Sequence, residues 1–357
     1  MADKVKWGII GTGVIAPNHA KAITASEYAE LVAVCDVDEP KAREFAAQYG
    51  NPAVYTDYIK MLDEAGLEAV SICTPSGMHS QMTIDAADRG IHVLCEKPMA
   101  ITLDQMDAMV EAVKRNGIKA GIIFQRRTSP LSQKVRDAVQ AGVLGQMVLG
   151  DAYLKYYRSP AYYKSADWRA TWELDGGGAL MNQGVHGIDL LLWIMGSPVK
   201  TVFAKAEAKV RDIEVEDTAV AVLTFENGAY GVIEGTTSCN PGEISTFAFH
   251  GDRGTIIFGD RGLVRWAVAP SRDEVAQDDP SQAVDAQSTV RSPNDPRSLS
   301  SQGHQFQVDD LALAIRQNRE PFVTPEQARA AVELILAIYE SARTGKEIVM
   351  KDFVARR

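Results

Sequence analysis

The first third of the chain alternates short, continuous apolar segments with segments of helical period. The apolar segments are residues 5–11, 31–36, 69–75, 92–98 and 118–125, and helices are expected at 14–26, 40–49, 55–66, 79–90 and 103–116. Strands whose apolar residues do not alternate with polar ones are typical of a parallel sheet covered by helices on both faces. The pattern predicts an α/β fold with a doubly wound first domain over residues 1–126.

Beyond residue 126 the pattern changes to longer, alternating strands. Hairpin turns are expected at 225–230 and 250–255, and helices at 131–141, 176–196, 304–317 and 325–343, the last opened by the capping sequence TPEQ. Residues 270–300 hold few large apolar side chains and predict a long surface loop or a partly disordered segment. The sequence therefore predicts a second, α+β domain over residues 127–357 with a mostly antiparallel sheet.

Composition excludes several classes of protein. The 357 residues carry a formal charge of −10, without the clustered cations that nucleic-acid binding requires. No apolar run has the length of a membrane span and no signal-peptide pattern precedes the first strand, so a cytoplasmic protein is expected. The four cysteines show no CxxC spacing and are expected in the core, without a metal or redox role.

A glycine motif joins the first strand to the first helix. Gly11, Gly13 and Ala16 form a G-x-G-x-x-A pattern, and Asp36 ends the second strand. Such glycines allow a tight turn and close approach of backbone N–H groups to a pyrophosphate, which makes this a Rossmann-type dinucleotide site. Asp36 would bind the ribose hydroxyls and repel a 2′-phosphate, so NAD is predicted over NADP. Further cofactor contacts are expected from Val14, Ile15, Thr74, Pro75, Ser76 and His79.

Candidate catalytic residues lie in both domains. Lys97 ends the fourth strand, and a buried ammonium is unfavourable unless it is paired or used, so it is either a structural partner of Glu96 or a catalytic group. Asn182, His186 and Asp189 are spaced i, i+4 and i+7, which places them on one face of the predicted helix 176–196. We expect Lys97 and His186 to carry acid-base chemistry and Asn182 and Asp189 to contact the substrate.

Three polar residues follow the fifth strand. Gln125, Arg126 and Arg127 are expected at the domain junction, with Gln125 near the cofactor. The two guanidinium groups would bind a substrate carboxylate or phosphate, or form a salt bridge between the domains.

Taken in order, these motifs resemble the Gfo/Idh/MocA group of NAD(P)-dependent oxidoreductases, which act mainly on sugars, inositols and sugar derivatives. The resemblance implies a substrate between the domains and an open sheet face that forms homo-oligomers, dimers or tetramers. It equates Lys97 with the family's E-K-P lysine and His186 with its helix histidine, and it brings Glu96, Lys97, Trp168 and Arg169 toward the nicotinamide or the substrate. Many members have Asp where this chain has Asn182, a difference that weakens an inositol assignment.

The leading hypothesis is an NAD-dependent sugar dehydrogenase or reductase, most like members that oxidise the 3-hydroxyl of glycosides or sugar nucleotides. One alternative is a glycoside hydrolase that keeps NAD bound and acts by transient C3 oxidation and elimination. Another is an inositol or polyol dehydrogenase. A non-enzymatic, NAD-sensing regulator is disfavoured because both Lys97 and His186 are present.

Overall fold

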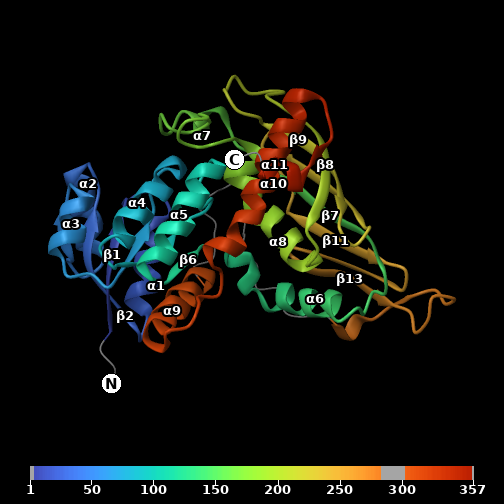
Figure 1. Cartoon of the computed structure of the whole chain (residues 1–357), viewed down its shortest axis with the longest axis horizontal. Coiled ribbons are helices and arrows are strands. Elements are labelled where there is room, and N and C mark those ends of the chain that lie inside the picture. Colours follow the sequence, from blue (N-terminus) through green and yellow to red (C-terminus); the bar gives the residue numbers. More distant parts are fainter. Residues whose placement is uncertain (1–3, 283–301, 356–357) are drawn as a thin grey trace. The chain divides into compact units, whose positions relative to one another are not determined.

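The computed structural model describes residues 4–282 and 302–355 and divides the chain into two compact units (Figure 1). The first unit is Met1–Gln125 with Ser301–Arg329, and the second is Arg126–Ser300 with Ala330–Arg357. The change of unit after Gln125 falls where the sequence pattern changes. The expected loop at 270–300 lies outside the described residues from position 283 onward.

The first unit is built on a parallel sheet of six strands in the order β3-β2-β1-β4-β5-β6. Its strands are β1 (Val5–Ile10), β2 (Ala29–Cys35), β3 (Ala53–Tyr55), β4 (Ala69–Ile72), β5 (His92–Cys95) and β6 (Ala120–Ile122). Its helices are α1 (Ala16–Ala25), α2 (Glu39–Gln48), α3 (Tyr58–Glu64), α4 (His79–Ala87), α5 (Leu103–Asn116) and α9 (Gln302–Gln317). The predicted doubly wound fold is confirmed, and the short edge strand β3 was not expected.

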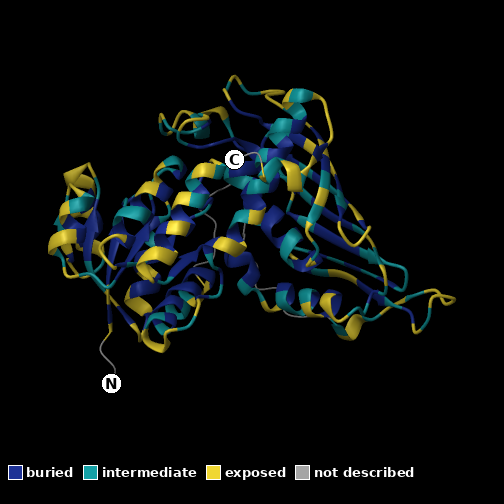
Figure 2. Cartoon of the chain, in the orientation of Figure 1, coloured by how far each residue is buried: buried dark blue, intermediate teal, exposed yellow. Residues whose placement is uncertain are grey.

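Burial explains why these strands read as continuous apolar segments. All four residues of β4 are buried, although successive side chains point to opposite faces, so both faces of the sheet are covered (Figure 2). The core includes the fully buried side chains of Trp7, Ile9 and Leu94. Each large apolar side chain buried in this way stabilises the fold by about 1.5–3 kcal/mol.

Helix α9 belongs to the first unit, whereas the sequence assigned it to the second. Its Val308 and Leu311 join the core of the parallel sheet, and the helix packs on α1. Gln307 extends the contact to β6, because its amide donates to the carbonyl of Ile122 and accepts from the N–H of Phe124. The apolar stripe of a helix shows that it is buried but not which sheet it covers, which is why the sequence misassigned α9.

The second unit contains a nine-stranded, mostly antiparallel sheet in the order β14-β13-β12-β11-β7-β10-β9-β8-β15. The strands are β7 (Met147–Lys155), β8 (Val199–Glu207), β9 (Thr218–Phe225), β10 (Tyr230–Thr236), β11 (Thr246–Gly251), β12 (Gly254–Gly259), β13 (Gly262–Val268), β14 (Gln277–Asp278) and β15 (Ile348–Val349). Both predicted hairpins are confirmed, as β9–β10 and β11–β12. Among the described strands of this second sheet, only β7 and β10 pair in parallel.

The remaining α-helices of the described residues are α6 (Pro130–Gln140), α7 (Pro160–Tyr163), α8 (Val185–Met195), α10 (Pro325–Thr344) and α11 (Met350–Val354). The expected helix 176–196 is instead a π-helical segment, Ala179–Gly184, followed by α8. The TPEQ cap is confirmed, because Thr324 and Gln327 each accept the backbone N–H of the other. None of the described helices is long and apolar enough to cross a membrane.

Candidate cofactor and catalytic site

The carboxyl ends of β1 and β4 meet at the point where the strand order reverses, which is where open α/β sheets bind ligands. Gly11 lies there with a φ of +86°. A Cβ at this position would lie 2.8 Å from the carbonyl oxygen of Cys73. Both the positive φ and the close approach to β4 require glycine.

The turn after Gly11 is open to a ligand. A Cβ placed on Gly13 would meet no heavy atom of the described residues within 4 Å, so protein packing does not explain this glycine. Helix α1 begins after Ile15, without a side-chain cap or an acidic first turn among the described residues. Backbone N–H groups at such a helix start attract a pyrophosphate, so the residues fit a dinucleotide.

Asp36, directly after β2, forms the other end of this site. Its Oδ2 accepts from the N–H and the hydroxyl of Thr12 and from Lys41 Nζ at 2.8 Å. Burial opposes ionisation of Asp36, but the hydrogen bonds from Lys41 and Thr12 outweigh it and lower the pKa of the carboxyl. Asp36 is therefore a carboxylate at neutral pH, as ribose binding requires.

His79 has an internal position. Its Nδ1 lies 2.7 Å from the carbonyl oxygen of Pro98 and its Nε2 lies 2.9 Å from that of Thr74. The side chain is 1% exposed, so the ring ties the loop after β4 to the loop after β5. These partners make His79 a support for the two loops, and its predicted cofactor contact remains a prediction. The predicted contacts of Thr74, Pro75 and Ser76 remain predictions.

Lys97 follows β5, and the residue before it is the centre of a buried cluster. Glu96 Oε1 lies 2.9 Å from His19 Nε2 and 3.1 Å from His304 Nε2, and Glu96 Oε2 accepts the N–H of Lys97 at 3.2 Å. The two histidines were missed in the sequence. His19 lies in the glycine-motif helix α1, which gave a weak local signal, but nothing in the sequence connects His304 with residue 96.

Buried His19 predicts a pH dependence of stability. Burial lowers the pKa of His19, more than its hydrogen bond to Glu96 raises it. Below about pH 6.5 the unfolded chain therefore binds more protons at this position than the folded chain does. The free energy of unfolding of the first unit should decrease as pH falls from 6.5, by up to about 1.4 kcal/mol per pH unit.

Urea unfolding at pH 7.5 and 5.5, followed by hydrogen exchange in β1 and β4, measures this dependence. His19→Gln should remove this titrating group and reduce the pH slope by up to about 1.4 kcal/mol per unit, whatever its effect on absolute stability. An unchanged slope would show that the folded chain protonates His19 as readily as the unfolded chain does.

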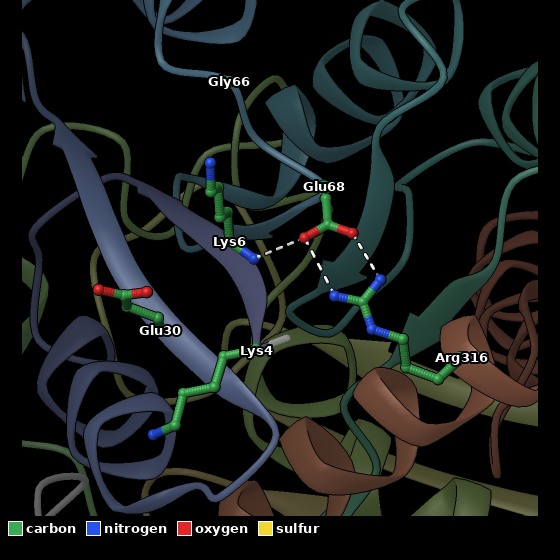
Figure 3. A pocket seen from close by; sticks show the side chains of 6 residues that line it. All are labelled: Lys4, Lys6, Glu30, Gly66, Glu68 and Arg316. Atoms are coloured by element: carbon green, nitrogen blue, oxygen red, sulfur yellow. Dashed lines mark hydrogen bonds and ion pairs between the residues drawn. The ribbon is translucent and has the colours of Figure 1, made fainter. Parts of the chain in front are cut away.

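A pocket of the first unit lies near the amino-terminal ends of the strands, beside the start of β1 and opposite the glycine turn (Figure 3). It is lined by Lys4, Lys6, Glu30, Gly66, Glu68 and Arg316. Glu68 accepts from Arg316 and from the backbone N–H of Lys6, so part of its charge is already neutralised within the pocket. This pocket is separate from the glycine turn and from Asp36.

In the second unit, Asn182 lies in the π-helical segment and His186 in the first turn of α8. The Asn182 amide donates to Asp175 Oδ1 and accepts from Gln183 Nε2, so its orientation is fixed. Asp175 is 3% exposed and its other oxygen accepts the N–H of Ala170. A carboxylate therefore contacts position 182 even though the residue there is an amide.

Glu216 holds the start of this segment. It accepts the N–H groups of Gly178 and Leu180 and the hydroxyl of Tyr339. Burial raises the pKa of Glu216 to about 7. A Cβ on Gly178 would collide with the Glu216 carbonyl oxygen, which explains the glycine directly before this segment.

Arg126 and Arg127 require a correction. Each forms a buried, bidentate ion pair within the second unit, Arg126 with Asp260 and Arg127 with Asp189. The alternative of a salt bridge between the domains is therefore wrong, and both guanidinium groups are already occupied by carboxylates of their own unit. Asp189 is 1% exposed and faces Arg127, so its predicted substrate contact is not supported.

Trp168 and Arg169 form a local stack. The Arg169 guanidinium lies 4.6 Å from the ring centre of Trp168 and 4.4 Å from that of Tyr162, and it donates to the Tyr162 hydroxyl. Both residues are partly exposed. Their predicted contact with the nicotinamide, and that of Gln125, remain predictions.

The fold and the glycine turn define a Rossmann-type, NAD-binding oxidoreductase. Residues 5–124 match the NAD-binding Rossmann domain of the GFO/IDH/MocA oxidoreductases, and residues 132–257 match the C-terminal domain of the same family. The chain belongs to this family.

Individual relatives are sugar-related enzymes. The D-glucoside 3-dehydrogenase of Escherichia coli is 30% identical over 71% of this chain and 76% of its own length. The myo-inositol 2-dehydrogenase of Thermotoga maritima is 31% identical over 71% of this chain and 74% of its own. The WlbA dehydrogenase of Bordetella pertussis, solved with NADH and UDP-GlcNAcA, superposes with a TM-score of 0.85 at 31% identity, covering 97% of this chain and 99% of that one.

Proposed function

We propose that this protein is an NAD-dependent dehydrogenase or reductase acting on a secondary hydroxyl or ketone of a sugar derivative, at C3 of a glycoside or sugar nucleotide. The observation that carries the proposal is the position of Lys97. It lies directly after β5, at the carboxyl ends of the parallel strands, where the glycine turn also lies. A lysine placed there beside a buried, ionised Glu96 suits chemistry at a hydroxyl next to a nicotinamide.

The roles of the side chains follow from their chemistry. When bound, NAD supplies the hydride acceptor. Lys97 stabilises negative charge on the reacting oxygen through its ammonium group, and His186 takes up the hydroxyl proton. Asn182 orients a hydroxyl of the substrate, because its amide is fixed by Asp175 and cannot itself pass on a proton.

Relatives support the choice of substrate. Glycosides and sugar nucleotides are the substrates or ligands of the Escherichia coli and Bordetella proteins, whereas the Thermotoga relative acts on an inositol. Asn182 in place of the aspartate common in inositol enzymes favours the first two classes. A glycoside hydrolase with tightly bound NAD is the alternative, and it would produce no net NADH.

A substrate panel tests the proposal. Glycosides, sugar nucleotides, free sugars and inositols are each added with NAD, and absorbance of NADH is followed while mass spectrometry detects retained cofactor and cleaved glycoside. NADH formation with a glycoside or sugar nucleotide supports the proposal. Glycoside cleavage without NADH formation favours the hydrolase, and oxidation of inositols alone would contradict the C3 assignment.

Cofactor choice gives a sharper prediction at Asp36. Asp36→Ala should weaken NAD binding by about 10- to 100-fold, because a charged hydrogen bond contributes roughly 1.5–3 kcal/mol. The same change should improve NADP binding relative to NAD, since Lys41 stays beside the vacated position. Lys41→Met is the matched control and should leave NAD binding within about threefold. Tighter binding of NADP than NAD by the unaltered protein, measured by calorimetry, would contradict the prediction.

The second unit also suggests self-association. Phe203, Val220, Val222 and Tyr230 are exposed on β8, β9 and β10, where alternate residues are buried. Apolar side chains gathered on one sheet face are typical of protein interfaces. A homodimer or homotetramer formed through this face is proposed, and light scattering measures its mass.

A further inference from the structure

The cluster beneath Lys97 is completely internal to the first unit. His19 and His304 are 0% exposed and Glu96 is 5% exposed, and they come from α1, α9 and the end of β5. Both histidines approach the same carboxylate oxygen, Oε1. The other oxygen faces the backbone N–H of Lys97. The carboxylate therefore connects two buried rings with the residue proposed to carry the chemistry.

The hydrogen bonds determine where the protons are. A carboxylate only accepts, so each histidine carries a hydrogen on Nε2. Trp7 Nε1 can only donate, and it lies 2.9 Å from Ser71 Oγ, which in turn lies 3.0 Å from His19 Nδ1. A neutral His19 accepts at Nδ1, so Ser71 donates to it. The chain of donors runs from Trp7 through Ser71 and His19 to Glu96 without an unmatched proton.

The cluster carries one negative charge. Burial lowers the pKa of His19, and hydrogen bonds from His19 and His304 outweigh burial to hold the pKa of Glu96 well below its usual range. His304 Nδ1 has no hydrogen-bond partner among the described residues, so a second proton there would be a buried N–H without an acceptor. Two neutral imidazoles and one carboxylate satisfy these conditions.

We propose that His19 and His304 are positioning residues for Lys97. They fix Glu96 through Oε1, so that Oε2 holds the Lys97 backbone at the end of β5. His79 secures the following residue, because its Nδ1 lies 2.7 Å from the Pro98 carbonyl oxygen. The inference rests on the proposed function, since it assigns the cluster to the lysine that acts on the substrate.

A metal ion is the competing interpretation. Ligand atoms of His19, Glu96 and His304 lie within 4.8 Å of one another, and two imidazoles with a carboxylate suit Zn²⁺. A metal on Nε2 would move the hydrogen of His19 to Nδ1. Ser71 would then accept from both Trp7 and His19 and lose the acceptor for its own hydrogen, so the donor chain favours a site without metal.

The test compares two variants at one position. His304→Leu removes the donor to Glu96, and His304→Gln keeps an N–H of similar reach. We expect His304→Leu to lower kcat by about 10- to 100-fold, with the Kd for NADH changed less than threefold, and His304→Gln to recover most of the loss. Hydrogen exchange at the Lys97 amide should accelerate in His304→Leu and return toward normal in His304→Gln. Ser71→Ala, a smaller change that releases His19, should give an intermediate effect if His304→Leu does not fold.

Several outcomes would overturn the inference. Normal kcat and normal Lys97 amide protection in His304→Leu, beside an inactive Lys97→Met, would reject positioning and leave the proposed function intact. One equivalent of metal in the purified protein would replace the hydrogen-bonded cluster with a metal site. If the unaltered protein oxidises no sugar, the proposed function fails. Hydrogen exchange still tests whether the histidines position Lys97, because the Lys97 amide should then exchange faster in His304→Leu but not in His304→Gln.

Discussion

Lys97→Met should reduce turnover by about 10²–10⁴-fold, the range that general acid-base catalysis and charge stabilisation contribute. Methionine matches the unbranched lysine side chain as far as Cε, with sulfur in place of Cδ, and lacks the ammonium group. NAD binding should change far less, because the glycine turn and Asp36 lie on β1 and β2 and not on β5. Turnover, calorimetric NAD affinity and melting temperature, measured on one preparation, separate these effects.

Lys114→Met is the matched control for this experiment. Lys114 is exposed in the last turn of α5, where it pairs with Glu326, so its loss should leave turnover unchanged. A purely structural Lys97 predicts a lower melting temperature with normal turnover per folded molecule. A Lys97→Met protein that is folded, binds NAD and remains fully active would refute the catalytic role.

His186→Ala extends the same test to the second unit. It should also lower turnover, and the double variant with Lys97→Met should lose less than the product of the two single effects if both residues serve one proton path. If the loss of turnover in the double variant equals the product of the two single losses, the two residues act in different steps.

The fold of the first unit could be predicted well from the sequence, because the patterns that indicate its strands and its glycine turn each lie within one short segment. Each strand of the parallel sheet except β3 lies largely or wholly within one expected apolar segment, and the glycine turn begins at Gly11, directly after β1. The G-x-G-x-x-A spacing fixes Gly11 where only glycine fits, so one short motif specifies both the local backbone and a binding chemistry.

Contacts between distant segments could not be predicted. His304 reaches Glu96 across 208 positions, and its apolar neighbours on α9 give no indication of that partner. The π-helical segment before α8 was read as ordinary helix, because its composition is helical and the Glu216 side chain that holds it lies on another part of the chain. In both cases the missing information was which segments pack together.

The two arginines after β6 show that sequence also fails to identify the partners of charged side chains. A guanidinium near a predicted domain junction indicates an anion partner, but sequence cannot distinguish a ligand from a carboxylate elsewhere in the chain. Asp260 and Asp189 lie 134 and 62 positions away from Arg126 and Arg127. Asp189 was itself expected on the substrate-facing side of its helix, so one ion pair joins two residues that were both predicted to contact the substrate.

The Arg127–Asp189 pair should be essential for stability. Burial raises the pKa of Asp189 and Arg127 partly offsets this effect, so removing the arginine leaves a buried carboxyl without its counter-charge. Arg127→Met should lower the free energy of unfolding of the second unit by about 3–5 kcal/mol. Denaturant unfolding, followed by hydrogen exchange in α8, measures the loss. Arg136→Met is the control, because Arg136 stacks on the same Trp193 ring but is more exposed, and it should lose less than about 1 kcal/mol.

The double variant Arg127→Met with Asp189→Leu decides between a structural and a substrate role. Replacing a buried ion pair by apolar side chains of similar volume is often neutral, so the double variant should recover most of the stability that Arg127→Met loses. Because the pair is occupied internally, the recovered protein should keep a KM for its sugar substrate close to that of the unaltered chain. If Arg127 instead bound a substrate carboxylate or phosphate, KM would rise at least tenfold in both variants, since a charged hydrogen bond contributes roughly 1.5–3 kcal/mol, and the second substitution could not restore it.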